Sequence, residues 1–172
     1  MIRDPIEISS TVIYSEIEGG SMEKEQFEAL MDLAMEREIE SAKFYHDLAI
    51  VMDNPVVSDI FLNLSKDEEE HRSFLDNYKQ QPYMHLKFKE IEAYHLNDSE
   101  ELPLLTMKMK PEDAISLAIK KEQLAVEFYT DLANRSVDDD IRNTCLELAK
   151  MEHGHKVKLE SQFELFMNQD TF

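Results

Sequence analysis

The stretch LAMEREIESAKFYHDLA at residues 33–49 recurs without gaps as LAIKKEQLAVEFYTDLA at residues 117–133. The same offset carries Glu68-x-x-His71 onto Glu152-x-x-His155. Within each copy, apolar residues recur at spacings of three and four, which is the period of an amphipathic helix. The sequence therefore predicts one helical hairpin that is used twice.

Two such hairpins predict an all-α four-helix bundle. The repeat halves are expected at about residues 22–80 and 111–168, joined by a long crossover over 81–110. Residues 1–20 read as an N-terminal arm, and residues 21–172 as the bundle domain. Within the first half, Asn54 can cap a helix that has Pro55 in its first turn. Pro111 is expected to begin the third helix in the same way.

Composition narrows the class of protein. The 172 residues suit one domain, and 3 Gly with 5 Pro leave room for long helices. A net charge of −19 disfavours nucleic acid and anionic membrane surfaces as partners. The single cysteine excludes an intramolecular disulfide and agrees with a reducing compartment. No stretch resembles a signal peptide or a membrane span, so we expect a cytoplasmic protein.

The repeated motif carries a set of metal-ligand side chains. Each Glu-x-x-His follows a lone glutamate, Glu38 or Glu122, by 30 residues, and all four glutamates fall within apolar stripes. Residues three apart lie on one helical face, so each Glu and His can share one ion, or the Glu can bridge two ions. Buried carboxylates at this density need cations. The alternative is that these residues are solvated and match the motif by chance. The predicted metal ligands are Glu38, Glu68, His71, Glu122, Glu152 and His155.

The donor set also indicates the metal. Carboxylates with one imidazole per ion suit iron or manganese and leave positions open for oxygen or peroxide. Structural zinc favours Cys/His tetrahedra, so zinc is expected only as a substitute in crystals.

Three further residues are predicted to support the ligands. Tyr45 and Tyr129 each follow a lone glutamate by seven residues, and we expect each to bond a ligating carboxylate across the bundle. The alternative role is that of a core aromatic. Asp67 is expected to accept the free N–H of a metal-bound histidine on the opposite helix, or else to face solvent. Because its repeat partner is Met151, the first role would make the two ions unequal.

Small residues near the ligands leave two open questions. Ser41 and Ala125 lie one turn after the lone glutamates, so a substrate pocket is expected beside them. Gly154 interrupts the second Glu-x-x-His. Close backbone packing near the metals and simple tolerance both account for that glycine.

These motifs (E-x6-Y, FYxDLA and E-x-x-H, each present twice) resemble the rubrerythrin branch of the ferritin-like superfamily over about residues 22–168. The resemblance implies a ferritin-like four-helix bundle with a non-heme di-iron centre. It implies terminal ligation by Glu38 and Glu122, bridging by Glu68 and Glu152, and one histidine on each ion. It also implies a homodimer, since rubrerythrins commonly form one.

The leading hypothesis is a di-iron oxidoreductase that reacts with hydrogen peroxide or oxygen in oxidative-stress defence. Alternatives are a ferroxidase or iron-binding protein without cage storage, a non-enzymatic helical module stabilised by metal, and a manganese site with catalase-like chemistry. The sequence departs from rubrerythrins at two places. Cys145 alone cannot form their rubredoxin-like site, so a separate electron-donor protein is expected. Ala125 stands where they carry an extra glutamate.

Overall fold

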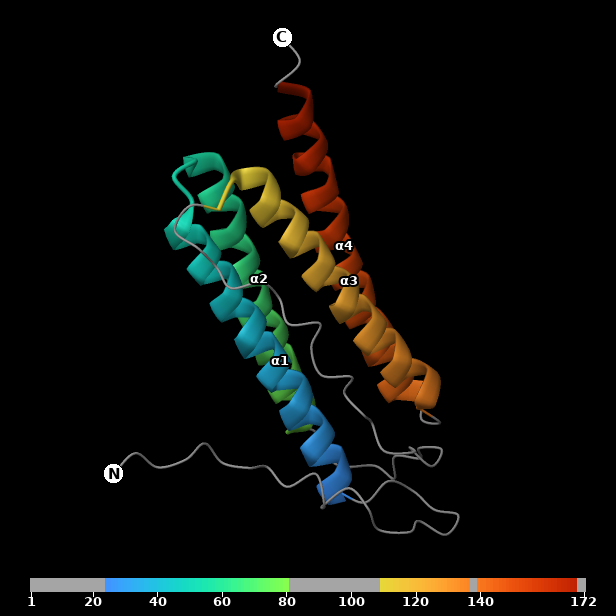
Figure 1. The fold of residues 1–172 in the computed structure, drawn as a ribbon. Helices are drawn as coiled ribbons and strands as arrows, with labels where there is room; N and C mark the ends of the chain where they lie inside the picture. The colour runs from blue at the N-terminus through green and yellow to red at the C-terminus, as the bar shows by residue number, and fades with distance from the viewer. Residues whose placement is uncertain (1–23, 81–108, 137–138, 170–172) are drawn as a thin grey trace, which may run out of the picture.

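The computed structural model describes residues 24–80, 109–136 and 139–169, and it contains four helices and, in these ranges, no strand (Figure 1). The helices are α1 (Lys24–Val51), α2 (Pro55–Lys79), α3 (Pro111–Arg135) and α4 (Asp139–Gln169). The predicted all-α class is confirmed. The predicted arm at 1–20, and the predicted crossover up to residue 108, lie outside the described residues. None of the four described helices combines the length and the apolar character needed to cross a bilayer.

Local sequence sets the starts of α2 and α3. The Asn54 side chain accepts hydrogen bonds from the backbone N–H groups of Val56 and Val57 at 3.0 and 3.2 Å, and Pro55 is the first residue of α2. Pro111 begins α3. Proline is favoured at this position because the first N–H groups of a helix have no intrahelical partner. Both predicted starts are confirmed.

The helices pair as two antiparallel hairpins, α1 with α2 and α3 with α4 (Figure 1). Helices α2 and α3 run in the same direction, so α3 begins at the end of the bundle opposite to where α2 ends. This is the arrangement that the sequence predicts for two repeated hairpins joined by a long connection.

The apolar core is divided into two clusters, one toward each end of the bundle. The first includes Phe27, Met31, Leu75, Phe128, Leu132, Ile141, Cys145 and Leu148. The second includes Leu48, Val57, Phe61, Leu64, Ile115, Ala118 and Leu159. Every helix contributes to both clusters and carries buried polar residues between them. The fold therefore places a belt of polar side chains at mid-height, with apolar packing on either side.

Two cation–π contacts join the hairpins. The guanidinium carbon of Arg37 on α1 lies 4.1 Å from the ring centroid of Phe128 on α3. The ammonium of Lys121 on α3 lies 5.3 Å from the ring centroid of Phe44 on α1. Both distances are within the range of favourable cation–π interaction. Positions 37 and 121 are equivalent in the repeat, as are positions 44 and 128. Each hairpin therefore places one cation on a phenylalanine ring of the other.

Candidate metal centre

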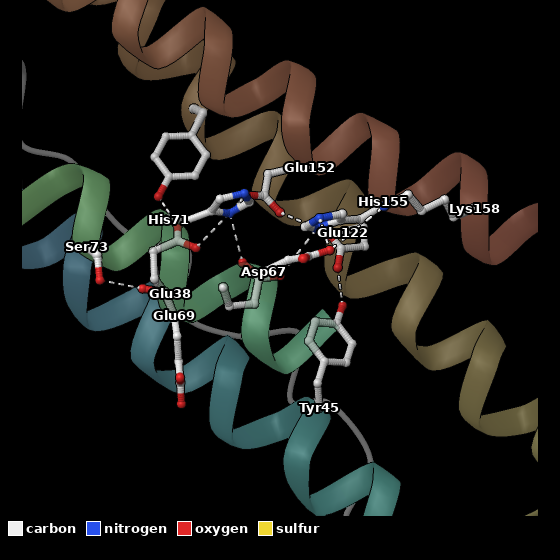
Figure 2. A network of polar contacts seen from close by, with 12 residues as sticks. Glu38, Tyr45, Asp67, Glu69, His71, Ser73, Glu122, Glu152, His155 and Lys158 are labelled. Carbon is white, nitrogen blue, oxygen red and sulfur yellow. Dashed lines mark hydrogen bonds and ion pairs between the residues drawn. The ribbon is translucent and has the colours of Figure 1, made fainter. Parts of the chain in front are cut away.

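The polar belt brings together all six predicted ligands. Figure 2 labels Glu38, His71, Glu122, Glu152 and His155 among them. Their ligand atoms form two groups of four, and within each group the atoms lie within 4.8 Å of one another. The first group is Glu38, Glu68, His71 and Glu152, and the second is Glu68, Glu122, Glu152 and His155. Glu68 and Glu152 belong to both groups, which places them where carboxylates can bridge two cations.

The histidines face the carboxylates from opposite hairpins. Nδ1 of His71 lies 2.9 Å from Glu152, 3.1 Å from Glu68 and 3.5 Å from Glu38. Nδ1 of His155 is 3.6 Å from both Glu68 and Glu152. The two imidazole rings are stacked, with centroids 5.3 Å apart and an interplanar angle of 11°. Each group therefore offers one nitrogen among several oxygens.

Burial divides the four carboxylates into two kinds. Burial raises the pKa of Glu38 and of Glu122 to about 8, so both hold protons at neutral pH without a metal. Burial also acts on Glu68, but the nearby imidazoles of His155 and His71 outweigh it and lower its pKa to about 2. The same two histidines hold the pKa of Glu152 below its usual value against the effect of burial.

The imidazoles respond in the opposite direction. Burial alone would lower the pKa of both histidines. The nearby carboxylates of Glu152, Glu38 and Glu68 instead raise the pKa of His71 to about 12. Glu122 and Glu152 likewise raise the pKa of His155 to about 11. In the metal-free centre, two imidazolium ions therefore balance two carboxylates, and Glu38 and Glu122 are neutral. Two protons on these glutamates and one extra proton on each histidine carry the positive charge that bound cations would otherwise supply.

Some buried atoms of the centre have no hydrogen-bond partner within the described part of the chain. They are Glu122 Oε2, Glu152 Oε1 and His155 Nδ1. Glu152 Oε1 lies 2.9 Å from His71 Nδ1, but the contact is outside hydrogen-bond geometry. Leaving a buried polar atom without a partner costs about 1–3 kcal/mol. The donor set and these orphaned atoms both fit divalent cations.

The two tyrosines reach across the bundle to the lone glutamates. The Tyr45 hydroxyl on α1 donates to Glu122 Oε1 on α3, and the Tyr129 hydroxyl on α3 donates to Glu38 Oε1 on α1. Burial, together with the nearby carboxylates, raises the pKa of both phenols well above the usual value, so they remain donors. Each bond occupies one carboxylate oxygen, and the other oxygen, Oε2, is left to face the centre.

Asp67 makes the centre asymmetric. Its Oδ2 lies 3.3 Å from Nε2 of His155 and 3.8 Å from Nζ of Lys158 (Figure 2). The equivalent position of the second hairpin is Met151, an exposed apolar side chain. Within the described helices, His155 therefore has the carboxylate neighbour that the sequence suggested, and Met151 offers none to His71. A carboxylate at this place fixes the tautomer and raises the basicity of a ligating histidine.

Replacing Asp67 with alanine is expected to lower the affinity for one of the two metal ions by about 10–100-fold. Losing a residue that hydrogen-bonds to a metal ligand has effects of this size. The ion in the His155 group should be affected, and the ion in the His71 group should keep its affinity. Competition with a chelator would resolve the two ions, with the exposed Glu70→Ala as control. Equal weakening of both ions would contradict the asymmetry.

The structure answers the two open questions on small residues. A cavity of about 460 Å³ does open between α1 and α2, but Ala42 lines it and neither Ser41 nor Ala125 does. A side chain at Gly154 would meet nothing within 4 Å, so tolerance, rather than close backbone packing, accounts for that glycine.

The fold has solved structural relatives. A hypothetical protein from Pyrococcus furiosus is 24% identical, with a TM-score of 0.60, over 85% of this chain and 93% of that one. An uncharacterized conserved protein from Magnetospirillum magnetotacticum is 21% identical, with a TM-score of 0.60, over 78% and 91%. A Thermotoga maritima protein described as a ferritin-like diiron-carboxylate protein is 20% identical, with a TM-score of 0.59, over 86% and 98%.

These similarities establish the ferritin-like fold that the sequence predicts. No functionally curated protein matches the sequence. Residues 28–162, which include all six clustered side chains, match the rubrerythrin family. This chain belongs to the rubrerythrin family.

Proposed function

We propose that this protein is a non-heme di-iron oxidoreductase that reacts with hydrogen peroxide or oxygen. The observation that carries the proposal is the pair of four-residue groups that share Glu68 and Glu152. Membership of the rubrerythrin family supports it. Ferrous ions bound by these residues would supply the two electrons that, with two protons, reduce hydrogen peroxide to two molecules of water.

The protein contributes ligands and their orientation. Glu38 and Glu122 would each hold one ion, Glu68 and Glu152 lie where they could hold both, and each histidine would serve one group. Four carboxylates balance the charge of two divalent ions. Tyr45 and Tyr129 keep the outer carboxylates in place, and the two apolar clusters exclude water above and below the centre.

Mixing the anaerobic ferrous protein with hydrogen peroxide in a stopped-flow instrument tests this function. The expected result is oxidation within seconds, with one peroxide consumed for every two ferrous ions. The exposed Glu70→Ala variant should behave like the native protein. A ferrous protein that carries two ions per chain and remains reduced in excess peroxide would contradict the proposal.

Continued turnover requires a source of electrons that reduces the oxidised centre again. Cys145 is the sole cysteine and is buried, so we propose that a separate electron-donor protein reduces the centre. We also propose a homodimer as the working form. Light scattering at micromolar concentration would measure the assembly.

A ferroxidase is the second candidate, favoured by the net charge of −19, which attracts cations. In that case ferrous iron is the substrate. The protein would then oxidise many more than two ferrous ions per chain in air, whereas the peroxide-reducing function leaves the iron in place. Counting the ferric ions formed per chain separates the two candidates.

A further inference from the structure

The cavity between α1 and α2 reaches the metal centre. Its volume is about 460 Å³, within the range of small-molecule sites. One wall is Glu38, whose buried carboxylate belongs to the first ligand group. The remaining lining residues are Ile39, Ala42, Lys43, His46, Ser65, Glu69 and Arg72. We call this cavity the α1–α2 cleft.

The second hairpin carries different side chains at the equivalent positions. Val126 replaces Ala42, Gln123 replaces Ile39 and Lys156 replaces Arg72. Lys156 on α4 donates to the Gln123 side chain on α3 at 2.8 Å, and Gln123 in turn donates to Glu127 at 2.7 Å. A polar link therefore joins α3 to α4 where Ile39, an apolar residue, can form none between α1 and α2. Within the cleft, the link between α2 and α1 is instead the Ser65 hydroxyl, which donates to the Ala42 carbonyl oxygen at 2.8 Å.

Two basic side chains line the cleft, although the chain as a whole is strongly acidic. Lys43 and Arg72 line it together with one exposed carboxylate, Glu69. Lys43 is paired with Asp47 at 2.5 Å, whereas Arg72 makes no ion pair with any residue that the structure describes. A guanidinium without a partner favours anions and polar neutral molecules and disfavours cations.

We propose that the α1–α2 cleft is the route by which small neutral or anionic molecules reach the Glu38–His71 side of the centre. Ala42 sets the width of this route and Arg72 its charge selectivity. The proposal deepens the proposed function, on which it rests for the presence of metal at the end of the cleft. It makes the two sides of the centre unequal in access.

Thiol labelling tests the cleft independently of any activity. Ser65→Cys places a thiol in the cleft, and Ala149→Cys places one at the equivalent position of α4, within the first apolar cluster. The two native residues are 8% and 7% exposed, so they form a matched pair. The native chain provides the blank, because burial raises the pKa of the Cys145 thiol to about 12.

With neutral methyl methanethiosulfonate, Ser65→Cys should react about tenfold or more faster than Ala149→Cys, since a core position reacts only on local opening. The anionic sulfonatoethyl reagent should react with Ser65→Cys faster than the cationic trimethylammonium reagent does. Adding Arg72→Glu should reverse that order, by about tenfold in the ratio of rates. Equal rates at the two positions, or an unchanged order with Arg72→Glu, would overturn the proposal.

Azide binding to the anaerobic ferrous protein tests whether the route ends at the metal. Ala42→Leu should slow azide association by about tenfold, because it puts into the cleft a larger side chain that must move first. Val126→Leu, at the equivalent position, should bind azide at the native rate. Metal analysis and thermal unfolding would show that both variants are folded and loaded.

The outcomes separate the route from the function. If Ala42→Leu slowed azide binding and the native protein did not react with peroxide, the results would support the cleft and reject the proposed function. Native rates of both azide binding and peroxide reaction in Ala42→Leu would reject the cleft and leave the function standing.

Discussion

Glu152→Ala is expected to yield a protein that retains neither metal ion. Glu152 belongs to both ligand groups, so its loss removes an oxygen from each ion at once. Glu38→Ala, in contrast, should lose one ion and keep the other, because Glu38 belongs to one group only. Metal analysis after dialysis at fixed free metal measures the number of ions per chain.

The same change should lower the thermal stability of the loaded protein. A ligand present at 100 times its dissociation constant stabilises the folded state by about 2.7 kcal/mol, and this contribution disappears with the metal. Glu147→Ala is the matched control on α4, since that side chain is 60% exposed and touches neither group. A Glu152→Ala protein that still bound two ions would show that Glu152 is not shared.

Binding of two divalent ions should release about four protons at neutral pH. Glu38 and Glu122 have pKa values of about 8, and those of His71 and His155 are about 12 and 11, so all four are protonated in the metal-free centre. Metal ligands must be deprotonated. Below pH 8 the overall binding constant for two ions should therefore rise by about four powers of ten per pH unit.

Calorimetric titration in buffers of different ionisation enthalpy counts these protons. Glu38→Gln should reduce the release by one proton for the pair of ions, if both still bind, because an amide has no proton to lose at this pH. Gln123→Glu, outside both groups, should leave the count unchanged. A release of one proton or none would contradict the assignment of protons to Glu38, Glu122, His71 and His155 in the metal-free centre.

Much of the fold follows from periodicity and local capping. The repeat places glutamates and histidines within apolar stripes, and a residue on the inner stripe of one helix must face the inner stripes of the others. The same reasoning leads Tyr45 to Glu122, although 77 residues separate them. Helix starts at Asn54–Pro55 and at Pro111 depend only on neighbouring residues, which is why the sequence suffices for them. That metals bind these side chains stays a prediction.

Other features depend on how helices sit against one another. The α1–α2 cleft needs Ala42 on one helix and Ser65 on the next, together with Ile39, whose side chain cannot form a link like that between Lys156 and Gln123. No single stretch of sequence contains this information, and the sequence-based expectation put the pocket beside Ser41 instead. The protonation of Glu38 likewise depends on how deeply its side chain is buried. A helical pattern shows that a residue lies on the buried face, but not how deep it lies.

The reciprocal contacts between α1 and α3 make the internal interface isologous, as in a symmetric homodimer. Each hairpin brings one phenol and one carboxylate to the exchange, and one cation and one phenylalanine ring. A single hairpin is thus complementary to a second copy of itself. Because both copies lie in one chain, each can change independently of the other. The repeat has Asp67 where the second copy has Met151, and Ala42 where the second copy has Val126. Such divergence allows twin metal positions to specialise.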